Sequence, residues 1–131
     1  GDVALIRRME AVSQPWNVSV PAQAAGIAAV KETAFVEKDR ALIAEQKAYL
    51  LEGLQKAGVK VFGSAANYIF FRAEEGLEKA MREAGFLIRD CGNFDGLTEG
   101  YYRIAVRGQE ENEKFLEALK KRTQNIWQNQ L

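Results

Sequence analysis

Residues 100–107 read Gly100-Tyr101-Tyr102-Arg103-Ile104-Ala105-Val106-Arg107, and their polarity changes with a period of two. Successive side chains of a β-strand point to opposite faces, so this segment predicts a strand with two different faces. The first face carries Tyr102, Ile104 and Val106. The second carries Tyr101, Arg103, Ala105 and Arg107. The apolar first face predicts helices packed against it, and we expect Arg103 on the opposite side, which must meet water, a ligand or another domain.

Three upstream segments also have the composition of strands. They are rich in aromatic and β-branched residues and cover residues 60–62, 67–72 and 86–89. Residues 63–66 separate the first two and predict a connecting turn.

Helical periodicity fills most of the remaining chain. We expect helices over about residues 2–12, from Ser19 through the Ala-rich stretch 22–30, from about Phe35 to Gly58, from Leu77 to Gly85, and through Phe115, Leu116, Leu119 and Ile126. Ser19 and Thr33 are expected to cap the second and third helices, with Pro21 in the first turn after Ser19. The order of elements predicts an α+β fold in which a short, mainly antiparallel sheet packs against helices, as one compact domain over residues 1–131.

The Ala-rich helix carries small or apolar side chains around most of its circumference. Such a helix is typical of positions enclosed on several sides. We expect the sheet of this domain to cover one side and a missing domain to cover another. Trp16 is interpreted as a core or interface residue.

The bulk composition excludes several classes of function. The chain has 131 residues with 18 Lys and Arg against 18 Asp and Glu, so it lacks the basic field typical of nucleic-acid binding. Without any histidine, Ser-His and Cys-His catalytic pairs and His-bearing zinc sites are excluded, and we expect no metal site. A single cysteine, Cys91, predicts a reducing compartment, the cytoplasm, and no apolar run is long enough to span a membrane. The chain starts at Gly1 rather than Met, from which we expect an excised piece of a longer protein.

Three segments together resemble the C-terminal third of class I/II (fold type I) pyridoxal-phosphate-dependent aminotransferases. They are QPWNVSVPAQAAG at residues 14–26, SAANYIFFR at 64–72, and LIRDC at 87–91 leading to GYYRIAV at 100–106. They are most similar to the branch that contains histidinol-phosphate aminotransferase and threonine-phosphate decarboxylase. The resemblance covers about residues 2–120 and implies that residues 1–131 are the C-terminal small domain of that fold.

The resemblance also implies roles for two arginines. Arg103 matches the arginine that grips the anionic end of the substrate, usually a carboxylate, and Arg89 looks like a second arginine that helps to bind a substrate phosphate or carboxylate. Guanidinium suits this task because it stays charged and offers parallel donors to two oxygens. An arginine on a half-exposed strand is also often simply solvated, and for Arg89 that interpretation stays open. The implied partners are an amino-acid or phosphorylated amino-acid substrate, the large domain of the same chain and a second copy in a homodimer.

Two further features near these arginines have simpler interpretations. Cys91 is interpreted as a small side chain beside a turn rather than a nucleophile. Gly92, Gly96 and Gly100 do not have the spacing of a phosphate-binding loop and predict a flexible connection.

The chain departs from the family in one respect. The family's catalytic lysine lies in a Ser-x-x-Lys or similar segment upstream of residue 14, and no Ser-x-x-Lys occurs in this sequence. We therefore expect pyridoxal 5'-phosphate in the full-length protein, none in this fragment, and no catalytic residue here. Transamination and decarboxylation both remain open, as does a free-standing α+β interaction module without catalysis.

Overall fold

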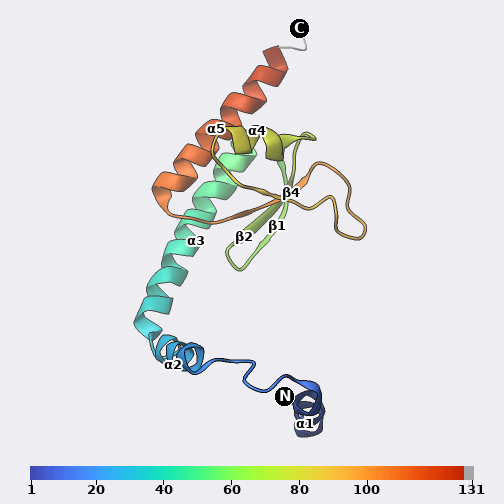
Figure 1. The fold of residues 1–131 in the computed structure, drawn as a ribbon. Coiled ribbons are helices and arrows are strands. Elements are labelled where there is room, and N and C mark those ends of the chain that lie inside the picture. Colours follow the sequence, from blue (N-terminus) through green and yellow to red (C-terminus); the bar gives the residue numbers. More distant parts are fainter. Residues whose placement is uncertain (129–131) are drawn as a thin grey trace. The chain divides into compact units, whose positions relative to one another are not determined.

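A computed structural model describes residues 1–128, with the side chains of residues 1–122 (Figure 1). Within that range the chain forms five helices and a four-stranded antiparallel sheet, so the predicted α+β fold is confirmed. In place of the single compact unit that the sequence predicts, the chain divides into two, Gly1–Glu37 and Lys38–Leu131. The sheet belongs to the second unit.

The sheet has the strand order β1-β2-β4-β3, and each neighbouring pair is antiparallel. Its strands are β1 (Lys60–Ala65), β2 (Tyr68–Arg72), β3 (Arg89–Asp90) and β4 (Tyr101–Ala105). The alternation predicted for β4 is confirmed, because Tyr102 and Ile104 are 1% and 6% exposed whereas Tyr101, Arg103 and Ala105 are half-buried.

The first strand is longer than predicted. Phe62 bulges out of the ladder after Val61, and pairing with β2 resumes at Gly63 and continues to the end of β1. A bulge adds one residue without ending the strand. The connection between β1 and β2 is therefore two residues, Ala66 and Asn67, rather than residues 63–66.

The strand predicted over residues 86–89 is wrong in extent, since β3 contains only Arg89 and Asp90. Phe86 and Ile88 pack against the core instead of pairing with β4, and the Phe86 ring meets the Phe115 ring edge-on at 5.8 Å. Leu87 between them is 85% exposed. Tertiary contacts thus replace strand pairing over this segment.

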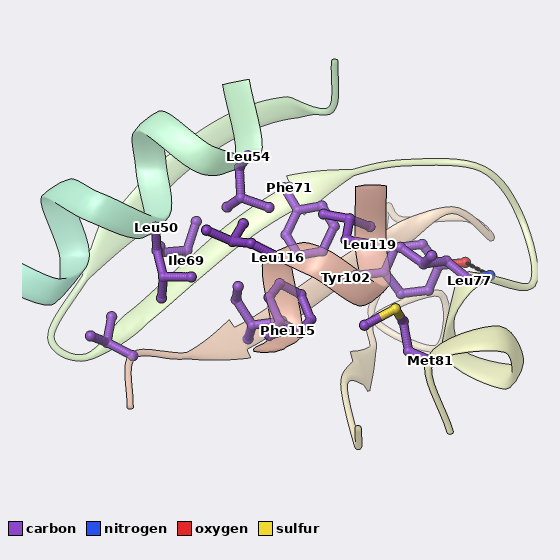
Figure 2. Packing of buried hydrophobic residues seen from close by; sticks show 12 residues of the cluster. Leu50, Leu54, Ile69, Phe71, Leu77, Met81, Tyr102, Phe115, Leu116 and Leu119 are labelled. Carbon is purple, nitrogen blue, oxygen red and sulfur yellow. Dashed lines mark hydrogen bonds between the residues drawn. The ribbon is translucent and has the colours of Figure 1, made fainter. Parts of the chain in front are cut away.

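The core lies between one face of the sheet and the helices α3 (Thr33–Lys56), α4 (Leu77–Glu83) and α5 (Gln109–Gln128). Figure 2 shows side chains from these helices meeting those of β2 and β4; the labelled residues are Leu50, Leu54, Ile69, Phe71, Leu77, Met81, Tyr102, Phe115, Leu116 and Leu119. Gly53 lets α5 approach α3 closely, because a Cβ at that position would lie 2.3 Å from Leu116 Cδ1. Ile126, which we expected on the buried side of the last helix, is outside the described side chains.

Two helices end where the sequence predicts. Gly58 after α3 and Gly85 after α4 have φ angles of 76° and 87°. The residue after each glycine donates its N–H to the last helical turn, from Val59 to the Leu54 carbonyl at 3.3 Å and from Phe86 to the Met81 carbonyl at 2.8 Å. This bond pattern is the Schellman motif. Thr33, by contrast, is the first residue of α3 rather than its cap.

The unit Gly1–Glu37 contains α1 (Val3–Val12) and α2 (Val20–Ala29). Ser19 caps α2 as predicted, since its side chain accepts the Ala22 N–H at 3.4 Å, and Pro21 lies in the first turn. Neither helix has a buried residue. Within this unit Trp16 is 88% exposed.

Candidate functional site

The sheet face turned away from the core, called the open face below, carries cations and aromatic rings. The strand registers and ring contacts place these side chains on it: Lys60, Phe62, Tyr68, Phe70, Arg72, Arg89, Tyr101 and Arg103. Asp90, the acid of β3, pairs with buried Tyr102, so its side chain starts from the other face and accepts the Gly92 N–H at 2.9 Å. The described strand positions of the open face thus carry positive charge without a carboxylate.

Arg103 lies near the centre of the open face. It pairs directly with Phe70 of β2 on one side and with Arg89 of β3 on the other. Its guanidinium carbon lies 4.3 Å from the centroid of the Tyr68 ring. Within the described residues, the positively charged Arg103 side chain contacts the Tyr68 ring. Its N–H groups form no ion pair with a carboxylate and no hydrogen bond there.

Two other arginines of the same unit have carboxylate partners. Arg107 Nε lies 3.3 Å from Glu111 Oε1, and Arg122 Nε lies 3.0 Å from Glu74 Oε1. A guanidinium that faces no carboxylate keeps its parallel donors available for an anion from outside the chain. The described contacts give Arg103 no carboxylate partner, and the same holds for Arg72 and Arg89 on the open face.

Arg89 is placed beside Arg103 by the β3–β4 register. Side chains directly opposite in an antiparallel pair have Cβ atoms about 4.5–5.5 Å apart, and like charges in such a pair repel. Arg89 Nη2 donates to Asn93 Oδ1 at 3.2 Å, and its guanidinium carbon lies 5.4 Å from the Phe94 ring centroid. The register therefore places the two arginines side by side on the strands, while their guanidinium groups contact Tyr68 in one case and Asn93 and Phe94 in the other.

Three aromatic rings form a continuous layer over the rest of the open face. The Phe62, Phe70 and Tyr101 centroids are 5.5–5.7 Å apart. Arg72 lies over the Tyr101 ring at 5.3 Å and Lys60 over the Phe62 ring at 5.1 Å. The sequence pattern places Tyr101 on the same face as Arg103 but indicates no role for the rings of β1 and β2, although alternate residues of 68–72 are aromatic or basic.

The sequence predicts a flexible connection from β3 to β4, but two of its glycines pack closely against backbone carbonyl groups. Gly100 has a φ of 90°, and a Cβ there would lie 3.0 Å from the Ala73 carbonyl oxygen. A Cβ at Gly92 would lie 3.1 Å from the Thr98 carbonyl oxygen. These close approaches fix the ends of the two strands that carry Arg89 and Arg103.

Cys91 follows β3 and is buried. Burial raises the pKa of its thiol, an effect that the neighbouring charges of Arg103 and Arg89 oppose. A buried thiol with a raised pKa is a weak nucleophile. This surrounding agrees with the interpretation of Cys91 as a packing residue.

A pyridoxal phosphate site needs a lysine amine poised to react with the cofactor. The described lysine side chains are all at least partly exposed. Lys60, the lysine on the open face, starts from β1, at the opposite edge of the sheet from Arg89. No group of three or more Cys, Asp or Glu in the described part of the chain could hold a metal ion.

No helix among residues 1–128 is both long and apolar enough to cross a membrane.

Comparison with known proteins points to one family. Residues 1–119 match the sequence profile of the family Aminotransferase class I and II. Histidinol-phosphate aminotransferase of Symbiobacterium thermophilum is 39% identical over 109 residues, which cover 81% of this chain and 30% of the relative. Threonine-phosphate decarboxylase of Salmonella typhimurium is 32% identical over 123 residues, which cover 91% of this chain and 34% of the relative.

A solved structure shows the same similarity in three dimensions. The crystal structure of the histidinol-phosphate aminotransferase from Clostridium acetobutylicum matches with a TM-score of 0.87 and 31% identity, over 93% of this chain and 38% of that chain. This chain thus spans about a third of the length of the curated relatives that it matches.

Proposed function

This chain belongs to the class I and II aminotransferase family, and we propose that residues 1–131 are the C-terminal, substrate-binding small domain of a longer pyridoxal-phosphate-dependent enzyme. In that full-length protein, Arg103 and Arg89 bind the anionic groups of an amino-acid or phosphorylated amino-acid substrate. The observation that carries the proposal is their direct pairing across β3 and β4 on a face without carboxylates.

Two arginines at directly paired strand positions suit a substrate with more than one negative charge. Each can present two parallel N–H donors to two oxygens of a carboxylate or phosphate. The half-buried position of Arg103 strengthens such an interaction relative to one in open water. We therefore assign Arg103 to the carboxylate and Arg89 to a second anionic group, a phosphate or carboxylate.

Pyridoxal phosphate, when bound to the full-length protein, supplies an electron sink for breaking bonds at the substrate's α-carbon. The contribution of this chain is to hold the substrate by its anionic ends, which fixes the position of that carbon. The remaining two thirds of the protein would supply the lysine and the cofactor-binding groups. On this proposal the chain alone is inactive, and the full-length protein works as a cytoplasmic homodimer.

The test is an assay of the full-length protein with pyridoxal phosphate added. Histidinol phosphate with a 2-oxo acid as amino acceptor tests transamination, and threonine phosphate tests decarboxylation through release of carbon dioxide. Turnover of either substrate supports the proposal and selects the reaction. A cofactor-loaded protein that turns over neither of them, nor any other anionic amino acid, would overturn it.

One observation favours a second candidate, a non-catalytic interaction module. Every residue of α2 is exposed, as on a surface that binds another protein. The reading frame separates the two candidates. An upstream cofactor domain with a lysine motif supports the enzyme, and a start codon directly before Asp2 supports the module.

A further inference from the structure

We propose that Tyr68 is a positioning residue for Arg103: its ring holds the guanidinium in place so that the N–H donors face the substrate anion. This inference rests on the proposed function of Arg103. It adds a residue that does not itself touch the substrate.

The register explains how the two side chains meet. Tyr68 pairs directly with Ala105, and Arg103 is two residues before Ala105 on the same face of β4. Ala105 has a small side chain, which leaves space above it for Arg103 to extend over the ring. The resulting distance of 4.3 Å is well inside the roughly 6 Å range of a cation–π contact.

Phe70 lies directly opposite Arg103, but its ring contacts two other aromatic rings. It stacks with Tyr101 at 5.7 Å and packs on Phe62 at 5.6 Å. Tyr68 is outside that layer and is the ring that Arg103 covers.

The backbone of Tyr68 is held from both sides. Ser64 Oγ donates to the Tyr68 carbonyl at 2.8 Å, and the preceding residue, Asn67, accepts the Val106 N–H at 2.7 Å. A ring on such a fixed backbone restricts the conformations of an arginine that no carboxylate orients. No hydrogen bond of the Tyr68 hydroxyl occurs within the described residues, so the ring rather than the hydroxyl should matter.

The experiment compares Tyr68→Phe and Tyr68→Ile in the full-length protein. The readouts are KM and kcat for its substrate, and the inhibition constant of inorganic phosphate as a simple anion probe. Phenylalanine keeps the ring, whereas isoleucine favours the strand but removes the ring. We expect Tyr68→Phe to match the unmodified protein, and Tyr68→Ile to raise both KM and the inhibition constant about two- to fivefold, with a smaller change in kcat.

Tyr49→Leu is the matched control. Tyr49 is 39% exposed, close to the 41% of Tyr68, but it lies on α3 rather than on the sheet. It should change neither constant. If Tyr68→Ile fails to fold, Tyr68→Trp retains a ring and should bind phosphate at least as tightly as the unmodified protein.

The outcomes distinguish this inference from the proposed function. If Arg103→Lys weakens phosphate binding and Tyr68→Ile does not, the positioning role is wrong and the function of Arg103 stands. A Tyr68→Phe variant as impaired as Tyr68→Ile would assign the effect to the hydroxyl and overturn the inference. An unaffected Arg103→Lys variant would instead refute the proposed function.

Discussion

Tyr102 and Arg103 are neighbours in β4 with opposite surroundings. The Tyr102 side chain is buried, and its hydroxyl accepts the Leu77 N–H at 3.2 Å and donates to the Glu74 carbonyl at 2.9 Å. Arg103 extends from the same strand over the open face. The buried tyrosine therefore anchors, from the core side, the strand that presents the arginine.

The ionisation of Tyr102 gives a prediction at the scale of one residue. Burial raises the pKa of Tyr102 to about 12, from an ordinary value of 10. Between these pH values the unfolded chain loses this proton and the folded chain keeps it. Stability should therefore be fully present below pH 10 and should fall as pH rises toward 12, by roughly 2–3 kcal/mol from this group. Urea unfolding across this pH range measures the slope.

Tyr102→Phe is the control, because it removes the titrating hydroxyl and keeps the ring. Its free energy of unfolding should fall less steeply with pH than that of the unmodified chain. Identical slopes would show that Tyr102 does not titrate differently in the folded state.

At the scale of the elements, the contact between α3 and α5 depends on Gly53. An added Cβ would lie 2.3 Å and 2.7 Å from the two methyl carbons of Leu116, which is 3% exposed and has little space to move. We expect Gly53→Ala to lower the free energy of unfolding by about 1–3 kcal/mol, despite the better helix propensity of alanine.

Gly26→Ala in α2 is the comparison for this change. A Cβ at Gly26 meets nothing within 4 Å, so the substitution should leave unfolding of residues 38–131 unchanged. If Gly53→Ala were equally neutral in urea unfolding, the close approach of α5 to α3 would be wrong.

The elements also show what a sequence can and cannot predict. The helix ends at Gly58 and Gly85 and the alternating burial along β4 depend on residues close together in the sequence. These predictions are confirmed. The bulge at Phe62 could not be predicted, because it depends on pairing with a strand several residues away. The shortened β3 could not be predicted either, because core contacts of Phe86 replace strand pairing.

The candidate site was predictable to the same extent. The sequence placed Arg103 and Arg89 on strands, and the family resemblance suggested their roles. Their direct pairing and the position of Tyr68 beneath Arg103 follow from strand register, which the sequence pattern does not specify.

At the scale of the whole molecule, the exposed apolar side chains of the Gly1–Glu37 unit need a partner. Ile27 lies in α2 and is 58% exposed. Val30, the residue directly after α2, is 78% exposed. Large exposed apolar patches mark interaction sites. On the proposed function, this surface would contact the large domain or the second subunit of the full-length protein.

The isolated chain should therefore self-associate, and light scattering should report a mass above that of a monomer at high concentration. Replacing Ile27 and Val30 with glutamine should shift the chain toward the monomer. Leu87→Gln is the control, because Leu87 is 85% exposed and lies outside this unit. A monomer at all concentrations would contradict the assignment of this surface.

On the proposed function Arg103 binds the anionic end of the substrate, and kinetics of Arg103→Lys in the full-length protein measure this role. Lysine keeps the charge but loses the paired donors. A charge-assisted hydrogen bond contributes about 1.5–3 kcal/mol, so kcat/KM should fall about tenfold to a hundredfold while cofactor loading stays unchanged. Arg107→Lys, on an exposed arginine paired with Glu111, should change neither quantity. Kinetics of Arg103→Lys equal to those of the unmodified protein would contradict the account.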